Sequence, residues 1–459
     1  MLRYLLSIGL LLAGSLWLSL EGPAPQRALA RRLRSAPSLS TLAATLVGGS
    51  LTSQHVARLL AWEEGGEWEA RTRGAPGLSA EQVYEAARAQ ALAWRPHFRA
   101  RALPAGGVLQ VLVSCNGLDY PTRLDPALLD LVEGLSAHAS VNVTLWGPGW
   151  PRFEGGVRDH VGENAGRTFG CDAFDVILFR GEGFNAMRCG NSQRAVVVQD
   201  LADCPRDCAR TFSRQADVIL SAHASPLWEI FDIDKRVDML DKPRLFVHAP
   251  HCASARVAAA AGLAPWADRW RASASASAAL PAPHAAPPAR TAAAPAPARA
   301  PATLAYAPAS DPALAPARAL AAAHAAALAG SALCALDADS RAFFTRGHAA
   351  ALMAGCPLRA PPAALGPPGE LAQLLLPALV PAGEAAGGGG GERARALRAA
   401  YSLLLAREQL TCESRAEALL DAVEAFRGGA VGTHFPHSTS VGCAHYAGQP
   451  MPHAWCALK

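Results

Sequence analysis

The sequence predicts an α/β fold with a doubly wound parallel sheet in its N-terminal half and a smaller α/β domain in its C-terminal half. Short runs rich in β-branched residues alternate with helical segments between residues 106 and 252, as in doubly wound sheets. The runs are apolar almost throughout, which is typical of strands covered on both faces. The strand candidates are Val108–Ser114, Val141–Trp146, Phe174–Phe179, Ala195–Gln199, Asp217–Ser221 and Arg244–His248.

The helix candidates rest on capping residues and apolar periodicity. Ser79 and Gln82 have the spacing of a capping box and open a segment whose apolar face continues to Trp94. Asp125 and Pro126 suit the cap and first turn of a helix that ends near His138. Three further helical segments follow in the C-terminal half: Phe343–Ala354, Arg393–Glu408 and Arg415–Phe426.

Composition excludes several classes of protein. The chain has 459 residues, of which 51% are hydrophobic and 17% charged, so it is neither a charged disordered tail nor a coiled coil. Lys and Arg number 42 against 38 Asp and Glu, a net charge of +4. That balance argues against nucleic acid as a partner, because nucleic-acid binders normally carry a strong basic excess. The length allows two to four domains.

The N-terminus has the layout of a membrane anchor. Tyr4–Leu20 carries no charge and follows Arg3. Bulky residues, including Trp17 and Leu20, stand where a signal peptidase prefers small ones, which favours an uncleaved type II anchor over a cleaved signal. We therefore expect a secretory-pathway membrane protein on the lumenal side of the Golgi or endoplasmic reticulum. Secretion after signal cleavage is the alternative.

Changes in composition along the chain predict six regions. The Ala- and Pro-rich stretch in the second half cannot build a packed core and is typical of an extended linker. The predicted organisation is a signal anchor at 1–20, a stem and helical region at 21–100, a Rossmann-like domain at 101–255, a low-complexity linker at 256–330, a C-terminal domain at 331–430 and an irregular tail at 431–459.

The eleven cysteines favour disulfides or free thiols over a metal site. Cys204 and Cys208 have no matching Cys or His pair beside them, so a local disulfide or free thiols is favoured over half a metal site. The C-terminal His and Cys residues fit no standard zinc module. We expect no bound metal. The spacing leaves the disulfide pairing open.

Polar residues follow the predicted strands at the edge where open α/β sheets bind ligands. After the first strand, Asn116 and Gly117 allow a tight turn, Asp119 could act as a general base, Arg123 could hold a charged ligand group, and Tyr120 is a candidate for substrate binding. The alternative is a plain turn followed by a surface ion pair, and the sequence does not decide between the two.

Later strands end in similar residues. His223 follows the fifth strand, and Trp228 beside Glu229 suits sugar recognition by ring stacking and hydroxyl hydrogen bonds, although a core Trp is the commoner explanation. His248 and His251 close the sixth strand, where they could donate to a substrate oxygen or act as a general base. The chain has no P-loop, no G-x-G-x-x-G after a strand and no G-x-S-x-G elbow, which argues against common NTPases, dinucleotide oxidoreductases and α/β-hydrolases.

The segments VLVSCNGLDYPTRLDP and ADVILSAHASPLWEIFDIDKRVDMLDKPRLFVHAPHCA resemble the amino half of GT-B glycosyltransferase-like proteins. The closest resemblance is to the spore-coat-maturation type glycosyltransferase-like family, in its membrane-anchored eukaryotic members. Phe343–Pro357 and Tyr401–Phe426 are similar to segments of its carboxyl half. The resemblance implies two Rossmann-like domains facing a cleft, with the acceptor in the amino half, a nucleotide-sugar in the carboxyl half and no bound metal.

The resemblance also assigns residues. Arg346 matches the basic position that faces the donor phosphates, and Gly355 matches the tight turn before the next strand. A Glu that holds donor hydroxyls is expected near Ala350 and is absent. The low-complexity stretch stands where the carboxyl domain should open with a strand and a Gly-rich turn. That domain is therefore degenerate, interrupted by an insertion, or affected by a faulty gene model.

The predicted function is that of a membrane-anchored glycosyltransferase, which moves a sugar from a nucleotide-sugar donor to a glycan, protein or lipid acceptor without a cofactor. Asp119, His223 and His251 are the candidate bases, and Arg346 would stabilise the leaving diphosphate. The alternative is a catalytically inactive carbohydrate-binding or scaffolding protein that keeps the fold. A hydrolase is disfavoured because no paired carboxylates stand at a readable spacing.

Overall fold

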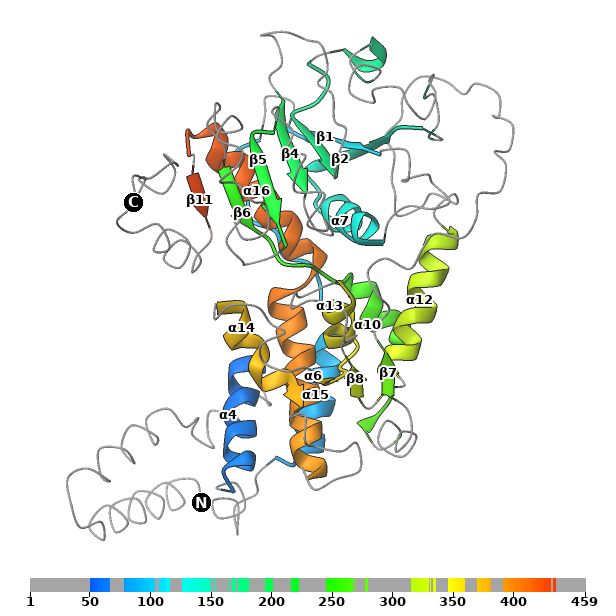
Figure 1. Ribbon diagram of the computed structural model, residues 1–459, viewed down its shortest axis with the longest axis vertical. Coiled ribbons are helices and arrows are strands. Elements are labelled where there is room, and N and C mark those ends of the chain that lie inside the picture. The colour runs from blue at the N-terminus through cyan, green and yellow to red at the C-terminus, as the bar shows by residue number, and fades with distance from the viewer. Residues whose placement is uncertain are drawn as a thin grey trace, which may run out of the picture.

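The computed structural model confirms an α/β protein with one large and one small parallel sheet (Figure 1). Each sheet belongs to its own hydrophobic core, and we call the two parts the first and the second unit. The structure describes residues 50–66, 78–103, 107–115, 126–148, 150, 153, 165, 167–170, 172–180, 195–200, 216–222, 245–266, 268, 277–279, 315–329, 331, 333–335, 346–359, 370–380, 391–430 and 432–434.

The large sheet contains all six predicted strands. They pair in the order β6-β5-β4-β3-β1-β2, every described pair is parallel, and β11 extends the sheet beside β6. The central strands are buried almost throughout, as their apolar sequences predict. The bounds are β1 Leu109–Ser114, β2 Val141–Trp146, β3 Val176–Arg180, β4 Val196–Asp200, β5 Val218–Ser221, β6 Leu245–His248 and β11 Gly432–His434.

Carboxylates just before two strands fix the alignment of neighbouring strands. Asp175 accepts a 2.9 Å hydrogen bond from the backbone N–H of Gln110 in β1. Asp217 accepts a 2.8 Å bond from the backbone N–H of Val197 in β4. Both bonds satisfy backbone donors at the amino ends of the strands. The carboxyl ends therefore meet at the opposite edge, where β6 leads towards the second unit.

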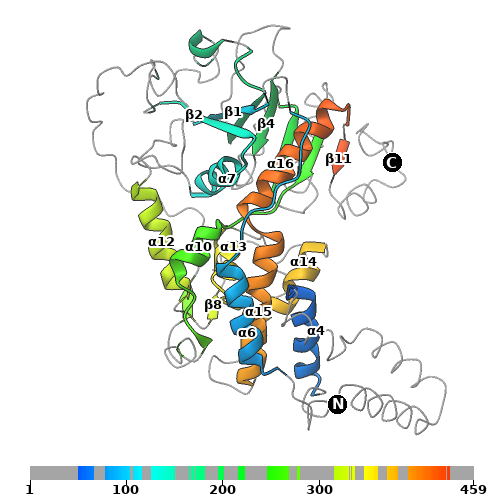
Figure 2. The same ribbon diagram turned by 180° about the vertical axis from the view of Figure 1, so that it is seen from behind.

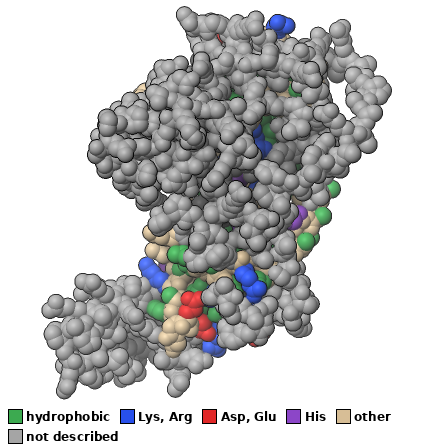
Figure 3. Space-filling model, viewed as in Figure 1, with side chains coloured by type: hydrophobic (Ala, Val, Ile, Leu, Met, Phe, Trp, Pro, Cys, Tyr) green, Lys and Arg blue, Asp and Glu red, His purple; other side chains and the backbone are tan. Residues whose placement is uncertain are grey.

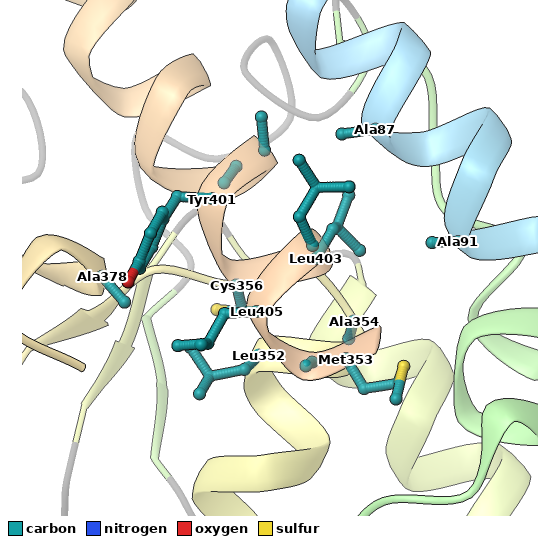
Figure 4. Packing of buried hydrophobic residues seen from close by; sticks show 14 of the residues in the cluster. Ala87, Ala91, Leu352, Met353, Ala354, Cys356, Ala378, Tyr401, Leu403 and Leu405 are labelled. Atoms are coloured by element: carbon teal, nitrogen blue, oxygen red, sulfur yellow. The ribbon is translucent and has the colours of Figure 1, made fainter. Parts of the chain in front are cut away.

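The second unit holds the small sheet and a group of helices around α15 (Glu392–Gln409). Its strands pair in the order β10-β9-β8-β7 and are β7 Ser277–Ala279, β8 Leu333–Ala335, β9 Leu358–Arg359 and β10 Leu379–Val380. Leu403 of α15 lies on the side that faces helix α6, and Tyr401 lies near Ala378 (Figure 4). The remaining elements are α4 Ser53–Glu64, α6 Ala80–Leu92, α10 Ala255–Ala261, α12 Ala315–Ala329, α13 Arg346–Met353, α14 Glu370–Leu375 and a 3-10 turn at Leu376–Ala378.

Helices α4 and α6 belong to this second core, although the sequence placed them in a separate stem and helical region. Val83, Tyr84 and Ala87 of α6 are buried in the same cluster as α15. The predicted capping box is confirmed, since Ser79 N donates to Gln82 at 2.7 Å and Gln82 N donates to Ser79 at 3.3 Å. Local periodicity predicted helix α6, but α15, against which it packs, lies about 300 residues further along the chain.

The expected low-complexity linker at 256–330 also differs from the structure. It includes most of α10 and all of α12, which pack against each other and against α13. Ala325, Leu328 and Ala329 of α12 are buried. Alanine has the highest helix propensity of all residues, so an Ala-rich stretch forms a helix where neighbouring helices offer a surface to bury it.

The last predicted helix, α16 (Cys412–Arg427), returns to the first unit. It packs against α7 (Pro126–Ser136) and against β5 and β6 (Figures 1 and 2). Thr411 caps it, because its hydroxyl accepts a 3.1 Å bond from Ser414 N. The predicted C-terminal domain at 331–430 is therefore divided, with α15 in the second unit and α16 on the large sheet.

Two further expectations concern the balance of surface charges and the membrane anchor. Basic and acidic side chains are interspersed over the second unit (Figure 3), in keeping with the net charge of +4. Within the described residues no helix is long and apolar enough to cross a bilayer. The predicted anchor at 1–20 and the tail beyond residue 434 lie outside those residues.

At Gly134 helix α7 packs closely against the backbone at the start of α16, and we expect Gly134→Ala to destabilise the protein by about 1–3 kcal/mol. An added Cβ would lie 2.6 Å from the carbonyl carbon of Cys412, which is backbone and cannot rotate away. Helix propensity alone would favour the alanine by about 1 kcal/mol. The sign of the change in the free energy of unfolding therefore shows whether helix propensity or the overlap with the Cys412 backbone is the larger effect. The measurement is urea unfolding of both proteins.

Gly391→Ala is the control, because the nearest atom to its added Cβ is 4.0 Å away. We expect a clearly smaller change there. A Gly134→Ala variant as stable as the parent would show that the backbones of α7 and α16 do not meet as described.

Candidate functional site

The described elements place three crossings between the two units: one between α6 and β1, one after β6, and one that joins α15 to α16. The last two lie side by side, and of this pair the first follows β6 and the second joins α15 to α16. A disulfide links Cys252 of the first crossing to Cys412 of the second. Ala253 N donates a 2.9 Å hydrogen bond to Leu410 O, which adds a short parallel bridge. These two crossings form one covalently closed joint at the carboxyl edge of the large sheet.

Arg415 lies on the first-unit side of this joint. Its side chain is buried, and it donates to the backbone oxygens of Ala249 at 2.9 Å and Pro250 at 2.7 Å. It also forms a 2.8 Å ion pair with buried Asp200, the last residue of β4. One guanidinium thus ties α16 to β4 and to the segment after β6. Sequence reasoning gave neither residue a role. The sequence feature that could have identified Arg415 is its position on the apolar face of α16, beside Ala416 and Leu419.

His248 and His251 lie at the ends of the segment that Arg415 holds. Burial lowers the pKa of His248 to about 4, with nearby Arg415 adding to the effect and a hydrogen bond to the Ala222 backbone opposing it. His248 is therefore neutral at physiological pH and a weak base. His251 is buried beside Cys252. The structure brings both histidines to the carboxyl edge of the large sheet, as predicted from their position after β6.

A second group of charged residues lies between α7 and three helices of the second unit. Arg346, the first residue of α13, forms an ion pair with Asp130 of α7. Glu133, one turn further along α7, pairs with Arg256 of α10 at 2.9 Å and Arg318 of α12 at 3.5 Å. We call these five residues the α7 ion cluster. The sequence predicted Arg346 as a site residue but gave no signal for the other four.

A cavity of about 300 Å³ adjoins the α7 ion cluster. Asp130, Glu133, Arg256 and Arg318 line it together with Ser254. The rest of its wall is apolar and comes from α7, α10 and α12: Leu129, Val257, Ala259, Ala260, Ala321 and Ala322. An apolar wall with a few converging charged groups is typical of sites for small molecules.

Glu413 and His324 add titratable groups near the cluster. Burial raises the pKa of Glu413, and the neighbouring carboxylates of Glu133 and Asp130 raise it further, against the lowering effect of Arg256. Burial also lowers the pKa of His324, and Arg346 adds to that shift. Both shifts favour neutral forms. Among the described residues, no group of three or more His, Cys, Asp or Glu residues could hold a metal ion.

Gly355 and Ala350 are the other two positions that the resemblance assigns, and both are part of the packing of the second unit. Gly355 has a φ of +67° in the turn between α13 and β9, and an added Cβ would meet Leu403 of α15 at 2.9 Å. Ala350, where an acidic residue was expected, is buried in the core of the second unit. A carboxylate at that position would lie among apolar side chains.

The remaining predicted site residues lie outside the described residues. They are Asn116, Gly117, Asp119, Tyr120, Arg123, His223, Trp228 and Glu229. Their roles stay predictions. The described residues Cys115 and Ala222, which directly precede two of these loops, are buried at the carboxyl ends of β1 and β5.

Comparison of this chain with protein-family models, curated proteins and solved structures finds no match.

Proposed function

We propose that this chain is a membrane-anchored glycosyltransferase of the GT-B type, which moves a sugar from a nucleotide-sugar to a glycan, protein or lipid acceptor. The observation that carries the proposal is the meeting of two parallel α/β units at one boundary. His248 at the end of β6 and His251 just after it lie on the first-unit side, and three guanidiniums, those of Arg256, Arg318 and Arg346, lie on the second-unit side.

The boundary carries the groups that such a transfer needs. The acceptor hydroxyl must lose a proton to a base, and the leaving diphosphate must be stabilised by cations. His251 is the described candidate for the base, because the low pKa of His248 makes that residue a poor one. Asp119 and His223 remain candidates in the neighbouring loops. The three guanidiniums are suited to phosphate oxygens, which arginine binds in a two-pronged geometry.

The disulfides support the proposed compartment. Cys252–Cys412 and Cys334–Cys356 both join buried cysteines, and disulfides persist mainly in oxidising compartments such as the secretory lumen. We propose a location on the lumenal side of a Golgi or endoplasmic reticulum membrane, with residues 1–20 as the anchor.

The second candidate is a catalytically inactive carbohydrate-binding or scaffolding protein. Two observations favour it. The guanidinium proposed to face donor phosphates is already paired with Asp130, and Ala350 replaces the expected acidic residue with a buried methyl group. Under this alternative the α7 ion cluster would only join the two units.

A thermal-shift screen of the full-length chain in mild detergent, against nucleoside diphosphates and nucleotide-sugars, separates the two candidates. A ligand at a hundredfold excess over its Kd stabilises the folded state by about 2.7 kcal/mol, so we expect one nucleotide class to raise the melting temperature. Arg346→Gln should remove the shift, and the matching nucleosides without phosphate are the control. No shift with any nucleotide, from a sample that melts cooperatively, would favour the inactive protein.

A further inference from the structure

The cavity between α7, α10 and α12 has a buried floor and an open mouth. Helices α10 and α12 pack against each other (Figures 1 and 2). Leu129 of α7 and Val257 of α10 line the cavity and are only 2% and 6% exposed, so they form its floor. Ala260 of α10 and Ala322 of α12 line it as well but are exposed, so they lie at its mouth. The cavity therefore opens to solvent between α10 and α12.

The wall of this cavity is aliphatic apart from Ser254 and the charged groups of the α7 ion cluster. Alanine, valine and leucine side chains supply the rest of it. None of the described residues that line it has an aromatic ring or an amide side chain. A flat ring or a sugar would find no ring to stack on there. A saturated hydrocarbon chain suits such a wall, because it binds through burial of apolar area alone.

The polar groups on the inner side of the cavity are bonded within the protein. Glu133 pairs with Arg256 at 2.9 Å and with Arg318 at 3.5 Å, and its side chain is only 8% exposed. The hydroxyl of Ser254 accepts a 3.2 Å hydrogen bond from the backbone N–H of Arg256. These bonds hold the polar atoms of the lining, so a hydrocarbon chain can lie beside them without leaving a buried polar group unpaired.

Arg256 is the cation at the mouth. Its side chain is 52% exposed, against 24% for Arg318, and it lines the cavity beside the exposed Ala260. An anionic group at the outer end of a bound chain would meet this guanidinium at the boundary with water, where it keeps most of its hydration. Hydrogen bonds between a guanidinium and a carboxylate are charge-assisted and have a defined two-pronged geometry.

The volume of the cavity sets the length of the chain. It measures about 300 Å³. An apolar cavity of about 150 Å³ accepts the six carbon atoms of benzene, so this one has room for about ten to twelve carbon atoms.

We propose that the cavity between α7, α10 and α12 binds a single-chain anionic amphiphile, a fatty acid of about ten carbon atoms. Its chain lies between Leu129 and Val257 on one side and the alanines of α10 and α12 on the other, and its carboxylate pairs with Arg256. This site goes beyond the proposed function and does not depend on glycosyl transfer.

The test is hydrogen exchange of the full-length chain in lipid nanodiscs, titrated with decanoate. Decanoate should lower deuterium uptake in α10 and α12, and the concentration at half effect gives the affinity. Hexanoate and octanoate complete a series in which we expect about two- to fourfold tighter binding for each added methylene. Acetate, which has the head group without the chain, should give no protection.

Two leucine variants locate the site. Ala321 lines the cavity, and Ala321→Leu should weaken decanoate binding about tenfold, because the larger side chain takes the space of about three methylenes. Ala319→Leu is the matched control, since Ala319 is exposed on the same helix and does not line the cavity. It should leave decanoate binding unchanged. Arg256→Gln should weaken the binding of decanoate but not of decanol, which has no charge.

Several results would overturn the inference. They are no protection of α10 and α12 by decanoate, equal affinity of Ala321→Leu and the parent, and equal weakening in both leucine variants. Decanol binding the parent as tightly as decanoate would contradict the role of Arg256. If Ala321→Leu does not fold, the chain-length series in the parent is the test, and an affinity independent of chain length would contradict an apolar site. Each measurement is made without nucleotide, so its failure leaves the proposed function standing.

Discussion

Removing the Cys252–Cys412 disulfide will lower the free energy of unfolding by about 5 kcal/mol. The bond joins residues 160 positions apart, and closing a loop of that length removes a large part of the entropy of the unfolded chain. It also links two of the crossings between the units, the one after β6 and the one between α15 and α16, so its loss acts on both. The variant is Cys252→Ala with Cys412→Ala, and the measurement is equilibrium unfolding of the full-length chain in urea under oxidising conditions.

The second disulfide supplies a matched control. Cys334 and Cys356 are equally buried but only 22 positions apart, so Cys334→Ala with Cys356→Ala should cost about 3 kcal/mol by the same loop argument. Both double variants remove two sulfur atoms from buried sites. An equal loss in the two variants would contradict the assignment of the longer bond as the joint between the units.

Replacing Arg415 by methionine will lower the free energy of unfolding by about 3–5 kcal/mol. The change takes the guanidinium away from Asp200, which is 2% exposed, and leaves a carboxylate in a buried site without its cation. The backbone oxygens of Ala249 and Pro250 lose their donor as well. Arg415→Lys keeps the charge but cannot reach all three acceptors, so we expect an intermediate loss.

A double-mutant cycle tests this prediction. Asp200→Asn in the Arg415→Met background removes the buried charge and should restore part of the stability, giving a coupling energy of about 1–3 kcal/mol. Arg427→Met is the matched control, because Arg427 lies 3.6 Å from Asp175 at a partly exposed site, where an ion pair contributes about 1 kcal/mol or less. Zero coupling between positions 200 and 415 would refute the ion pair.

The predicted strands were found because their signal is local. Val111, Ile177 and Val198 lie in short apolar runs that only a strand covered on both faces accounts for, and their strands pair in parallel as the alternation with helices predicts. The same holds for the Ser79 cap and for the helix that begins at Pro126. Each of these features depends on residues a few positions apart.

The candidate site was predicted in part. The rule that ligands bind at the carboxyl edge of a parallel sheet selected His248 and His251, and the structure places both there. Asp130 and Glu133 were missed because each sits in a helix where it looks like an ordinary surface charge, and Arg415 was missed although it stands on the apolar face of α16. Only the approach of another helix or strand, often more than 100 residues away, brings a partner to them.

The sequence by itself determined the α/β class, the six strands, the Ser79 cap of α6, and the edge of the sheet at which His248 and His251 lie. The tertiary structure decided which unit each helix joins: α4 and α6 pack on α15, α12 forms where a linker was expected, and α16 returns to the large sheet. The physical reason that only the tertiary structure decides this is hydrophobic burial. Periodicity shows that a helix has an apolar face, but many surfaces can cover that face, and the free energy of the whole chain selects among them.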